Sequence, residues 1–170
     1  CGKKRMKKSE RKREKMRKAG RAIVDGKGTK RIIRQMIAGR ISLRRAKTED
    51  AVLLWKWTND PEVRSSSFKS DLIPWKDHLR WYRQKIINQN SWIFIAENQT
   101  GEPIGQIRFD RENNIIKISY SLSKKFRGIG LGEQLLEKGI TKMKTCIDLP
   151  TMIKADVKKN NKTSQTIFKK

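Results

Sequence analysis

The residues Arg127 to Gly132 form a glycine-rich run where a strand-like segment, Ile115 to Ser123, gives way to an amphipathic helix. Glycine lacks a β-carbon, so Gly128, Gly130 and Gly132 allow a ligand to approach the backbone closely. The first N–H groups of the helix have no partner within the helix and carry a partial positive charge. A junction of this kind favours an anion, and a pyrophosphate fits it.

The spacing of this run excludes two common phosphate-binding motifs. A dinucleotide fingerprint needs glycine where Glu133 stands, and the triphosphate loop ends in Gly-Lys-Ser or Gly-Lys-Thr. The run instead matches Arg/Gln-x-x-Gly-x-Gly/Ala, and the chain resembles the GNAT superfamily of N-acetyltransferases. A glycine-rich turn without a ligand is the alternative. The resemblance implies that acetyl-CoA binds here as cosubstrate, on the residues Leu122, Arg127, Gly128, Ile129, Gly130, Leu131 and Gly132.

A second part of the resemblance lies downstream, where a strand-like run from Met152 to Val157 precedes Asn161, Ser164 and Phe168. In the family the two strands splay apart and the pantetheine arm of the cosubstrate lies between them, which implies that Asn161 and Ser164 contact the arm. Capping of the following helix is the alternative for both residues. Many relatives carry a tyrosine at the position of Phe168 to protonate the leaving thiolate. Here solvent or another side chain has to replace it, or activity is reduced.

The 170-residue chain carries a formal net charge of +25 and is long enough for one good hydrophobic core. It has two cysteines, Cys1 and Cys146, which suits a reducing compartment, so we expect a cytoplasmic protein. No apolar run approaches the ~20 residues needed to cross a membrane. We expect neither a membrane partner nor a metal.

Basic residues are concentrated in residues 1–40, which hold seventeen lysines and arginines against three acidic residues. Such a block occurs in arms that bind nucleic acid, and a basic nucleic-acid-binding module is the alternative function of a different class. No aromatic side chain is interleaved for base stacking. A solvated basic helix is therefore favoured, and nucleic acid is not expected as a partner.

Residues 1–40 and 41–170 are predicted to be separate units. The run from Ala22 to Ile32 resembles the carboxyl-terminal end of nucleotide-sugar hydrolases of the pseudaminic acid pathway. We therefore interpret residues 1–40 as a basic helical tail, the C-terminal remnant of a UDP-sugar hydrolase domain, and expect such a domain, fused or adjacent, as a partner of the second unit. Residues 41–170 are expected to form a truncated GNAT domain that lacks the last one or two strands, and whether this piece is active alone is left open.

Hydrophobic periodicity in residues 41–170 predicts a strand, two helices, three antiparallel strands, a helix, a strand and a helix. This is the element order of the GNAT fold, an α/β (α+β) architecture with a mixed, mostly antiparallel sheet and helices on both faces. In this prediction Thr48 caps the first helix. A serine-rich loop is expected from Arg64 to Ser70.

The segment from Trp57 to Trp81 carries a narrower resemblance, to sugar-nucleotide acetyltransferases of pseudaminic acid synthesis. These enzymes transfer acetyl to the 4-amino group of a UDP-linked aminodideoxy sugar, and the resemblance implies the same reaction here. The hydrolase and the acetyltransferase would then act on consecutive intermediates. A protein amino-terminal or small-molecule amine acetyltransferase is the alternative within the enzyme class.

Five residues of this segment are predicted to bind the UDP-sugar. An arginine and a serine offer donors to phosphate, two aromatic rings offer a surface for uracil or sugar, and a histidine offers a polar contact. These are Arg64, Ser67, Phe68, Trp81 and His78. A surface charge is the alternative for Arg64, and an exposed or capped imidazole is the alternative for His78. The general base is not assigned, and the candidates are His78, Glu97, Ser119 and Ser121.

Overall fold

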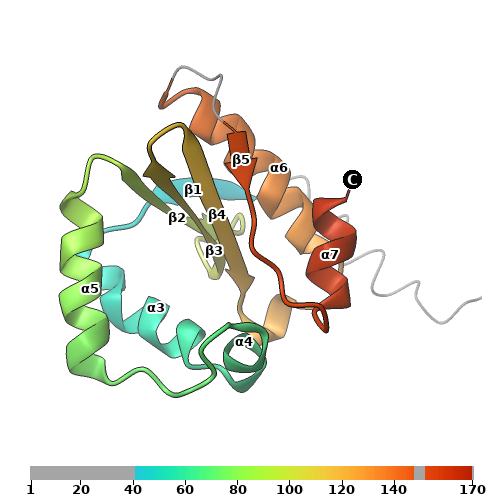
Figure 1. The fold of residues 1–170 in the computed structure, drawn as a ribbon, viewed down its shortest axis with the longest axis horizontal. Coiled ribbons are helices and arrows are strands. Elements are labelled where there is room, and N and C mark those ends of the chain that lie inside the picture. Colours follow the sequence, from blue (N-terminus) through green and yellow to red (C-terminus); the bar gives the residue numbers. More distant parts are fainter. Residues whose placement is uncertain (1–40, 148–151, 170) are drawn as a thin grey trace, which may run out of the picture.

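A computed structural model describes residues 41–147 and 152–169. The hydrolase-like tail predicted for residues 1–40 lies outside this range. Figure 1 shows the order of the elements along the chain. The first half consists of β1 (Ser42–Arg45), the 3-10 turn η1 (Thr48–Asp50), α3 (Ala51–Thr58), α4 (Pro61–Ser66), α5 (Trp75–Ile87) and β2 (Ser91–Glu97). The second half consists of β3 (Pro103–Glu112), β4 (Ile115–Leu122), the 3-10 turn η2 (Lys124–Phe126), α6 (Leu131–Lys144), β5 (Met152–Lys154) and α7 (Lys162–Phe168).

The strands form one five-stranded sheet in the order β1-β2-β3-β4-β5. The first three pairings are antiparallel, and β4 pairs with β5 in parallel. A parallel pair needs a crossover, which α6 provides. This arrangement confirms the predicted mixed, mostly antiparallel sheet.

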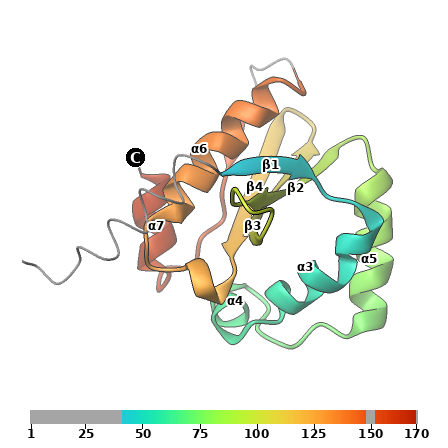
Figure 2. The ribbon, with the colours of Figure 1, turned by 180° about the vertical axis from the view of Figure 1, so that it is seen from behind.

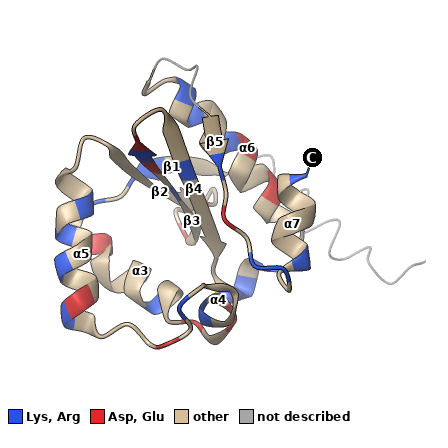
Figure 3. Cartoon of the chain, in the orientation of Figure 1, with Lys and Arg blue, Asp and Glu red and all other residues tan. Residues whose placement is uncertain are grey.

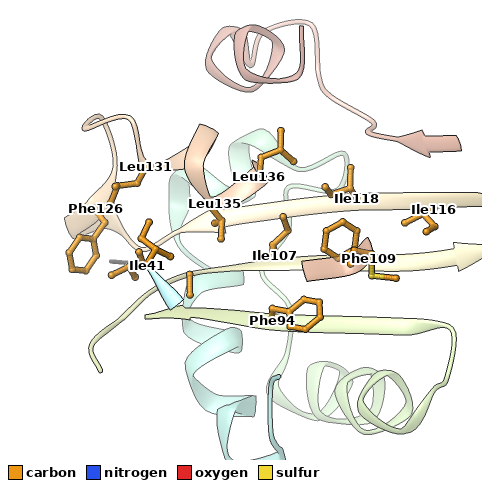
Figure 4. Packing of buried hydrophobic residues seen from close by; sticks show 13 residues of the cluster. Ile41, Phe94, Ile107, Phe109, Ile116, Ile118, Phe126, Leu131, Leu135 and Leu136 are labelled. Carbon is orange, nitrogen blue, oxygen red and sulfur yellow. The ribbon is translucent and has the colours of Figure 1, made fainter. Parts of the chain in front are cut away.

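Helices cover both faces of the sheet, as predicted. On one face α6 packs on β3 and β4, and the cluster includes Phe109, Ile118 and Leu135 (Figure 4). On the other face α3 and α5 pack on β2 through a smaller cluster that includes Leu54 and Tyr82. Figure 2 shows α6 and α7 to one side of the sheet and α3 and α5 to the other. Strand β2 is buried on both faces, which explains its continuous apolar run.

The local structure differs from the sequence prediction at three places. The serine-rich segment begins as a short helix, α4, because Asp60 accepts hydrogen bonds from the first backbone N–H groups and Pro61 follows it. Thr48 does not cap the first helix. Asp50 accepts from the backbone N–H of Lys47 at 2.8 Å instead, and its carboxylate pairs with Arg44. The strand expected to reach Val157 ends at Lys154.

A glycine on the inner face of α6 sets how closely this helix approaches the sheet. A β-carbon built on Gly139 would lie 2.4 Å from Cδ1 of Ile107, a distance that real β-carbons do not show. Gly139 and Ile107 are both buried. Close packing of α6 on β3 therefore requires glycine at this position, although glycine has a lower helix propensity than alanine.

The first prediction concerns this contact. Gly139→Ala is expected to lower the free energy of unfolding by up to about 2 kcal/mol, because overpacking outweighs the better helix propensity of alanine. Ile107→Val removes the offending methyl group, so the double variant should lose less stability than the two single variants together. Urea unfolding of all four proteins measures the coupling. Additive losses would show that this contact does not limit the packing of α6.

Candidate functional site

The sheet opens between β4 and β5. The two strands pair only at Ile115 to Lys117 and Met152 to Lys154. Strand β4 continues to Leu122 and stays paired with β3 over its whole length, while the chain after Lys154 leaves the sheet. Among the described residues, one edge of β4 from Ile118 to Leu122 therefore has no neighbouring strand, and Figure 1 shows the chain after β5 running away from β4 toward α7.

The ladder on the other side of β4 fixes which backbone groups face this open edge. The N–H of Ser123 donates to the carbonyl of Ile104 at 2.9 Å, across the β3 side. Hydrogen-bonding direction alternates along an antiparallel strand. The backbone groups of Tyr120 and Leu122 therefore point away from β3 and toward the gap, where an extended ligand can bond to them as a strand would.

The open edge leads directly into the glycine turn. Gly128 and Gly130 have φ values of +74° and +82°, which side-chain-bearing residues rarely adopt. A β-carbon on Gly128 would meet no atom of the described chain within 4 Å, so the space beside this residue is open. Helix α6 begins at Leu131, and its first N–H groups face the turn. The turn is thus a cradle that fits a pyrophosphate.

Gly132 has a packing reason to be glycine, beside the backbone access that the sequence suggested. It lies within the first turn of α6, and a β-carbon there would lie 2.9 Å from Cδ1 of Ile167 and 3.3 Å from Cε2 of Tyr120. The missing side chain lets β4 and α7 pack against the start of α6. This close packing explains why the position carries no side chain.

Arg127 joins the turn to the other half of the domain. Its Nε donates to the carbonyl of Leu122 at 2.9 Å, and its Nη1 pairs with Asp60 at 2.8 Å and with Glu62. Burial alone would raise the pKa of Asp60, but the hydrogen bond and charge of Arg127, with the N–H groups of Val63 and Glu62, lower it below its usual value. The side chain of Arg127 thus ties α4 to the end of β4.

Asn161 and Ser164 both lie at the start of α7, where the chain returns to the gap. The side chain of Asn161 caps the helix by accepting from the N–H of Ser164 at 3.1 Å. Ser164 Oγ lies 3.3 Å from the hydroxyl of Tyr120, which reaches across from β4. Capping accounts for Asn161 by itself, and Ser164 carries the contact between the two sides of the gap.

The structure uses Arg64 and Ser67 within their own loop. Arg64 donates from Nε to the carbonyl of Thr58 at 2.7 Å, from Nη1 to two loop carbonyls, and from Nη2 to Ser67 Oγ at 2.9 Å. These bonds occupy four of its five N–H donors. Burial lowers the pKa of Arg64, against the opposing charge of Asp71. Binding a phosphate would break hydrogen bonds by which Arg64 holds the loop. The geometry therefore supports a role for Arg64 in stabilising the loop.

The other three residues of the segment differ in their exposure. His78 is 2% exposed, and its Nε2 lies 3.0 Å from the carbonyl of Ala51, to which it must donate. Burial lowers its pKa and keeps the ring neutral. Phe68, by contrast, is 69% exposed at the tip of the loop. Trp81 is half-buried and lies under the guanidinium of Arg108, 5.0 Å from the ring centre. Of these three, Phe68 and Trp81 remain in reach of a ligand.

Asn59 and Trp55, to which the sequence assigned no role in the site, hold this segment together by hydrogen bonds to Ile73. Asn59 donates to the carbonyl of Ile73 at 3.0 Å and accepts from its N–H at 2.8 Å, and Trp55 Nε1 donates to the same carbonyl at 2.8 Å. The bonds close the loop between α3 and α5. An asparagine at the end of a helix signals a cap, but its partner fourteen residues away leaves no local signal.

The face of the sheet under this loop is polar at β3 and β4. Gln106, on β3, donates to Ser121 Oγ at 3.2 Å, and Arg108 is paired with Ser119 in the ladder. Glu97, at the end of β2, is bound to Arg44 at 2.5 Å on the far side of the sheet from β5. Among the base candidates, Ser119 and Ser121 therefore lie on the strand next to the gap, while His78 and Glu97 have other partners.

Two further classes of site find no support in the part of the chain that the structure describes. It holds no group of three or more histidine, cysteine or acidic side chains placed to bind a metal ion. Across residues 41–147 and 152–169, none of the helices combines the length and apolarity that crossing a membrane requires.

The fold and site define an α/β domain in which an open strand edge leads into a glycine turn at the start of a helix. The profile of the Acetyltransferase (GNAT) domain family matches residues 40–170. The chain therefore belongs to the GNAT acetyltransferase family, as its sequence predicted, and is an acyltransferase by class. No curated protein matches it in sequence.

Solved structures support the same fold at low sequence identity. Spermidine N-acetyltransferase from Vibrio cholerae, in complex with CoA and spermine, has a TM-score of 0.68 and 16% identity, over 77% of this chain and 79% of that one. A domain from Methanocaldococcus jannaschii has a TM-score of 0.66 and 19% identity, over 76% and 85%. The aminoglycoside acetyltransferase AAC(6')-Ib, in complex with ribostamycin and coenzyme A, has a TM-score of 0.62 and 18% identity, over 76% and 80%.

The second prediction concerns the bond between Arg127 and Asp60. Asp60→Asn should lower the free energy of unfolding at pH 7 by about 1–2 kcal/mol, because a charged hydrogen bond is lost. The folded-state pKa of Asp60 is lowered, so its contribution is full above the unfolded-state pKa and disappears as the pH falls through the folded-state value. Urea unfolding between pH 7 and pH 2 should show the two proteins converging at the acid end.

Glu62→Gln is the matched control, because Glu62 pairs with the same guanidinium from a side chain that is 73% exposed. Its loss should stay below about 1 kcal/mol. Equal losses for the two variants, or a loss by Asp60→Asn that does not change with pH, would contradict the assigned role of this ion pair.

Proposed function

We propose that this chain is an acetyl-CoA-dependent N-acetyltransferase whose acceptor is the 4-amino group of a UDP-linked aminodideoxy sugar in pseudaminic acid synthesis. The open edge of β4, which ends in the glycine turn, is the observation that supports acetyl-CoA as the acyl donor. The N–H groups from Ile129 to Gly132 would hold the pyrophosphate, and the backbone of Tyr120 and the N–H of Leu122 would hold the pantetheine arm. Ser164 closes the other side of the gap.

Acetyl transfer requires a neutral amine about 3 Å from the thioester carbon and a donor for the oxyanion that forms. Backbone N–H groups at the open edge of β4 are suited to that donor role, because they are already directed into the gap. Ser119 and Ser121 lie on the opposite face of the same strand, the face on which α3 and α5 pack. In this proposal the acyl donor lies along the open edge of β4, and the amine approaches from the face that carries Ser119 and Ser121.

The charges around the loop favour an anionic acceptor over a polycation. A polyamine would need carboxylates without partners, but two carboxylates beside the loop, Asp60 and Glu62, are paired with Arg127. Asp110, on the polar face of the sheet, is paired with Lys85 and Arg108. The chain as a whole has a formal net charge of +25, which attracts a nucleotide sugar by its diphosphate. Charged residues of both signs meet around α4 (Figure 3).

Exposed aromatic side chains complete the support for a nucleotide. Phe68 is 69% exposed and Trp75 is 38% exposed, and both belong to the segment whose residues resemble sugar-nucleotide acetyltransferases. Such rings bind uracil or a sugar face by stacking. Asn59 and Arg64 hold this segment in one conformation, so we assign them a structural role in the loop. We assign contact with the substrate to Phe68 and Trp81.

The third prediction tests the acyl-donor site by calorimetry with acetyl-CoA. Gly128→Glu should weaken binding at least ~10-fold, because the new carboxylate repels the pyrophosphate and the backbone φ of +74° is strained. Gly101→Glu is the matched control, since Gly101 has a φ of +77° in the turn between β2 and β3, and a β-carbon there would also meet no described atom within 4 Å. Both variants should lose similar stability. Equal affinity in both would overturn the assigned site.

The fourth prediction tests the acceptor. With acetyl-CoA, release of free thiol should be fastest with a UDP-linked 4-amino sugar, with kcat/KM at least ~10-fold above spermidine, an aminoglycoside or a peptide amine, since only the first offers a diphosphate and a uracil ring. UDP should inhibit in competition with the sugar nucleotide. A preference for spermidine or the aminoglycoside would overturn the acceptor and leave the acetyl-CoA site in place.

A further inference from the structure

One half-buried titratable group at the gap has no role in the function described so far. Tyr120 projects from β4 toward α6 and α7, and its hydroxyl lies 3.3 Å from Ser164 Oγ. The chain contains two tyrosines. The other, Tyr82, lies in the cluster under α3 and α5 and donates to the carbonyl of Lys47. Tyr120 is therefore the one tyrosine at the acyl-donor side.

Two helices, α6 and α7, border the Tyr120 side chain. A β-carbon on Gly132 would lie 3.5 Å from it, so the hydroxyl rests against the first turn of α6. The ring of Phe168 on α7 meets the Tyr120 ring edge-on, with centres 5.8 Å apart and an angle of 62°. Phe168 has no proton to give. Tyr120 and Ser164 are the hydroxyls that the structure brings together at this point.

The position matches the reacting end of the acyl donor. If the pyrophosphate lies at Ile129 to Gly132, the arm runs along the open edge of β4 away from the turn, and the thioester reaches the inner part of the gap. The backbone of Tyr120 faces that gap, as does its neighbour Leu122. In that pose the thioester would lie next to Tyr120, and the Tyr120 hydroxyl would be the tyrosine hydroxyl nearest to the departing sulfur.

The reaction needs a proton at that sulfur. The amine nitrogen forms a bond to the acetyl carbon and gives up one proton, the carbon–sulfur bond breaks, and its electron pair goes to sulfur. The products are an amide and a free thiol, so one proton must reach sulfur as one leaves nitrogen. A general acid at the sulfur contributes about 10²–10⁴ in rate.

We propose that Tyr120 is this general acid. Its O–H donates the proton to the departing sulfur, and the proton lost by the amine returns to the phenolate from solvent through Ser164. Burial raises the pKa of Tyr120, against the opposing hydrogen bond from Ser164, so the hydroxyl stays protonated until it is needed. The inference rests on the proposed function, because it requires a thioester in the gap.

Tyr120→Phe tests the proposal. Its kcat should fall about 100-fold, while calorimetry shows an acetyl-CoA affinity within about twofold of the parent chain. Tyr82→Phe is the matched control, since it also removes a buried tyrosine hydroxyl with a hydrogen bond, and it should keep kcat. An unchanged kcat in Tyr120→Phe would overturn the proposal. Failure of the parent chain to bind acetyl-CoA would overturn the proposed function together with this inference.

A double variant separates proton delivery from packing. Tyr120→Phe with Phe168→Tyr places the hydroxyl on the facing ring, and it should recover at least ~10-fold of the lost kcat. A merely structural tyrosine would not be rescued in this way. A double variant that stays as slow as Tyr120→Phe would overturn the proposal.

A spectroscopic readout is independent of turnover. With 13C at the tyrosine ring carbon that bears the hydroxyl, the two tyrosines give two resonances, assigned by the two phenylalanine variants. Adding coenzyme A, whose free thiol is the product, should shift the Tyr120 resonance and leave that of Tyr82 unchanged. Binding that leaves the Tyr120 resonance in place would overturn the contact with sulfur.

Discussion

The break in pairing between β4 and β5 is the feature on which the rest of the site depends. A parallel pair that continued to Leu122 would satisfy the backbone groups of β4 and leave nothing for a ligand to bond. Because the pairing stops at Lys117, the same backbone is directed into open space and leads to the glycine turn. In the proposed site the sheet itself thus supplies the groups that bind the ligand, and few side chains are needed.

Arg127 connects this edge to α4 and the loop that we propose for the acceptor. Its guanidinium bonds to the carbonyl of Leu122, on the strand that borders the gap, and to Asp60, which caps α4. Lys158, in the segment between β5 and α7, donates to the carbonyl of Ser65 at 3.0 Å and adds a second bridge to the same helix. The loop that carries Phe68 is therefore fixed to both sides of the gap, which positions the two halves of the proposed site relative to each other.

The sequence predicted the order of elements and the glycine turn because both have local signals: hydrophobic periodicity, and glycines at a strand-to-helix junction. It did not show which groups would take the donors of a side chain or approach a glycine in the folded chain. Arg64 looked like a phosphate ligand, but Thr58 and the loop carbonyls take its donors. His78 packs in the core between ring neighbours, and Gly132 is glycine because Tyr120 and Ile167 approach it. The Tyr120 contact with Ser164 joins two segments that no local pattern links.

Backbone amide chemical shifts during titration with acetyl-CoA test the central claim most directly. The account predicts the largest changes at Ile129 to Gly132, where the pyrophosphate accepts from N–H groups, and at Tyr120 and Leu122, whose backbone faces the gap. Amides of β2, which is buried between both helical layers, should hardly move. Saturable binding that shifts other amides and leaves the turn and the edge of β4 unchanged would contradict the account.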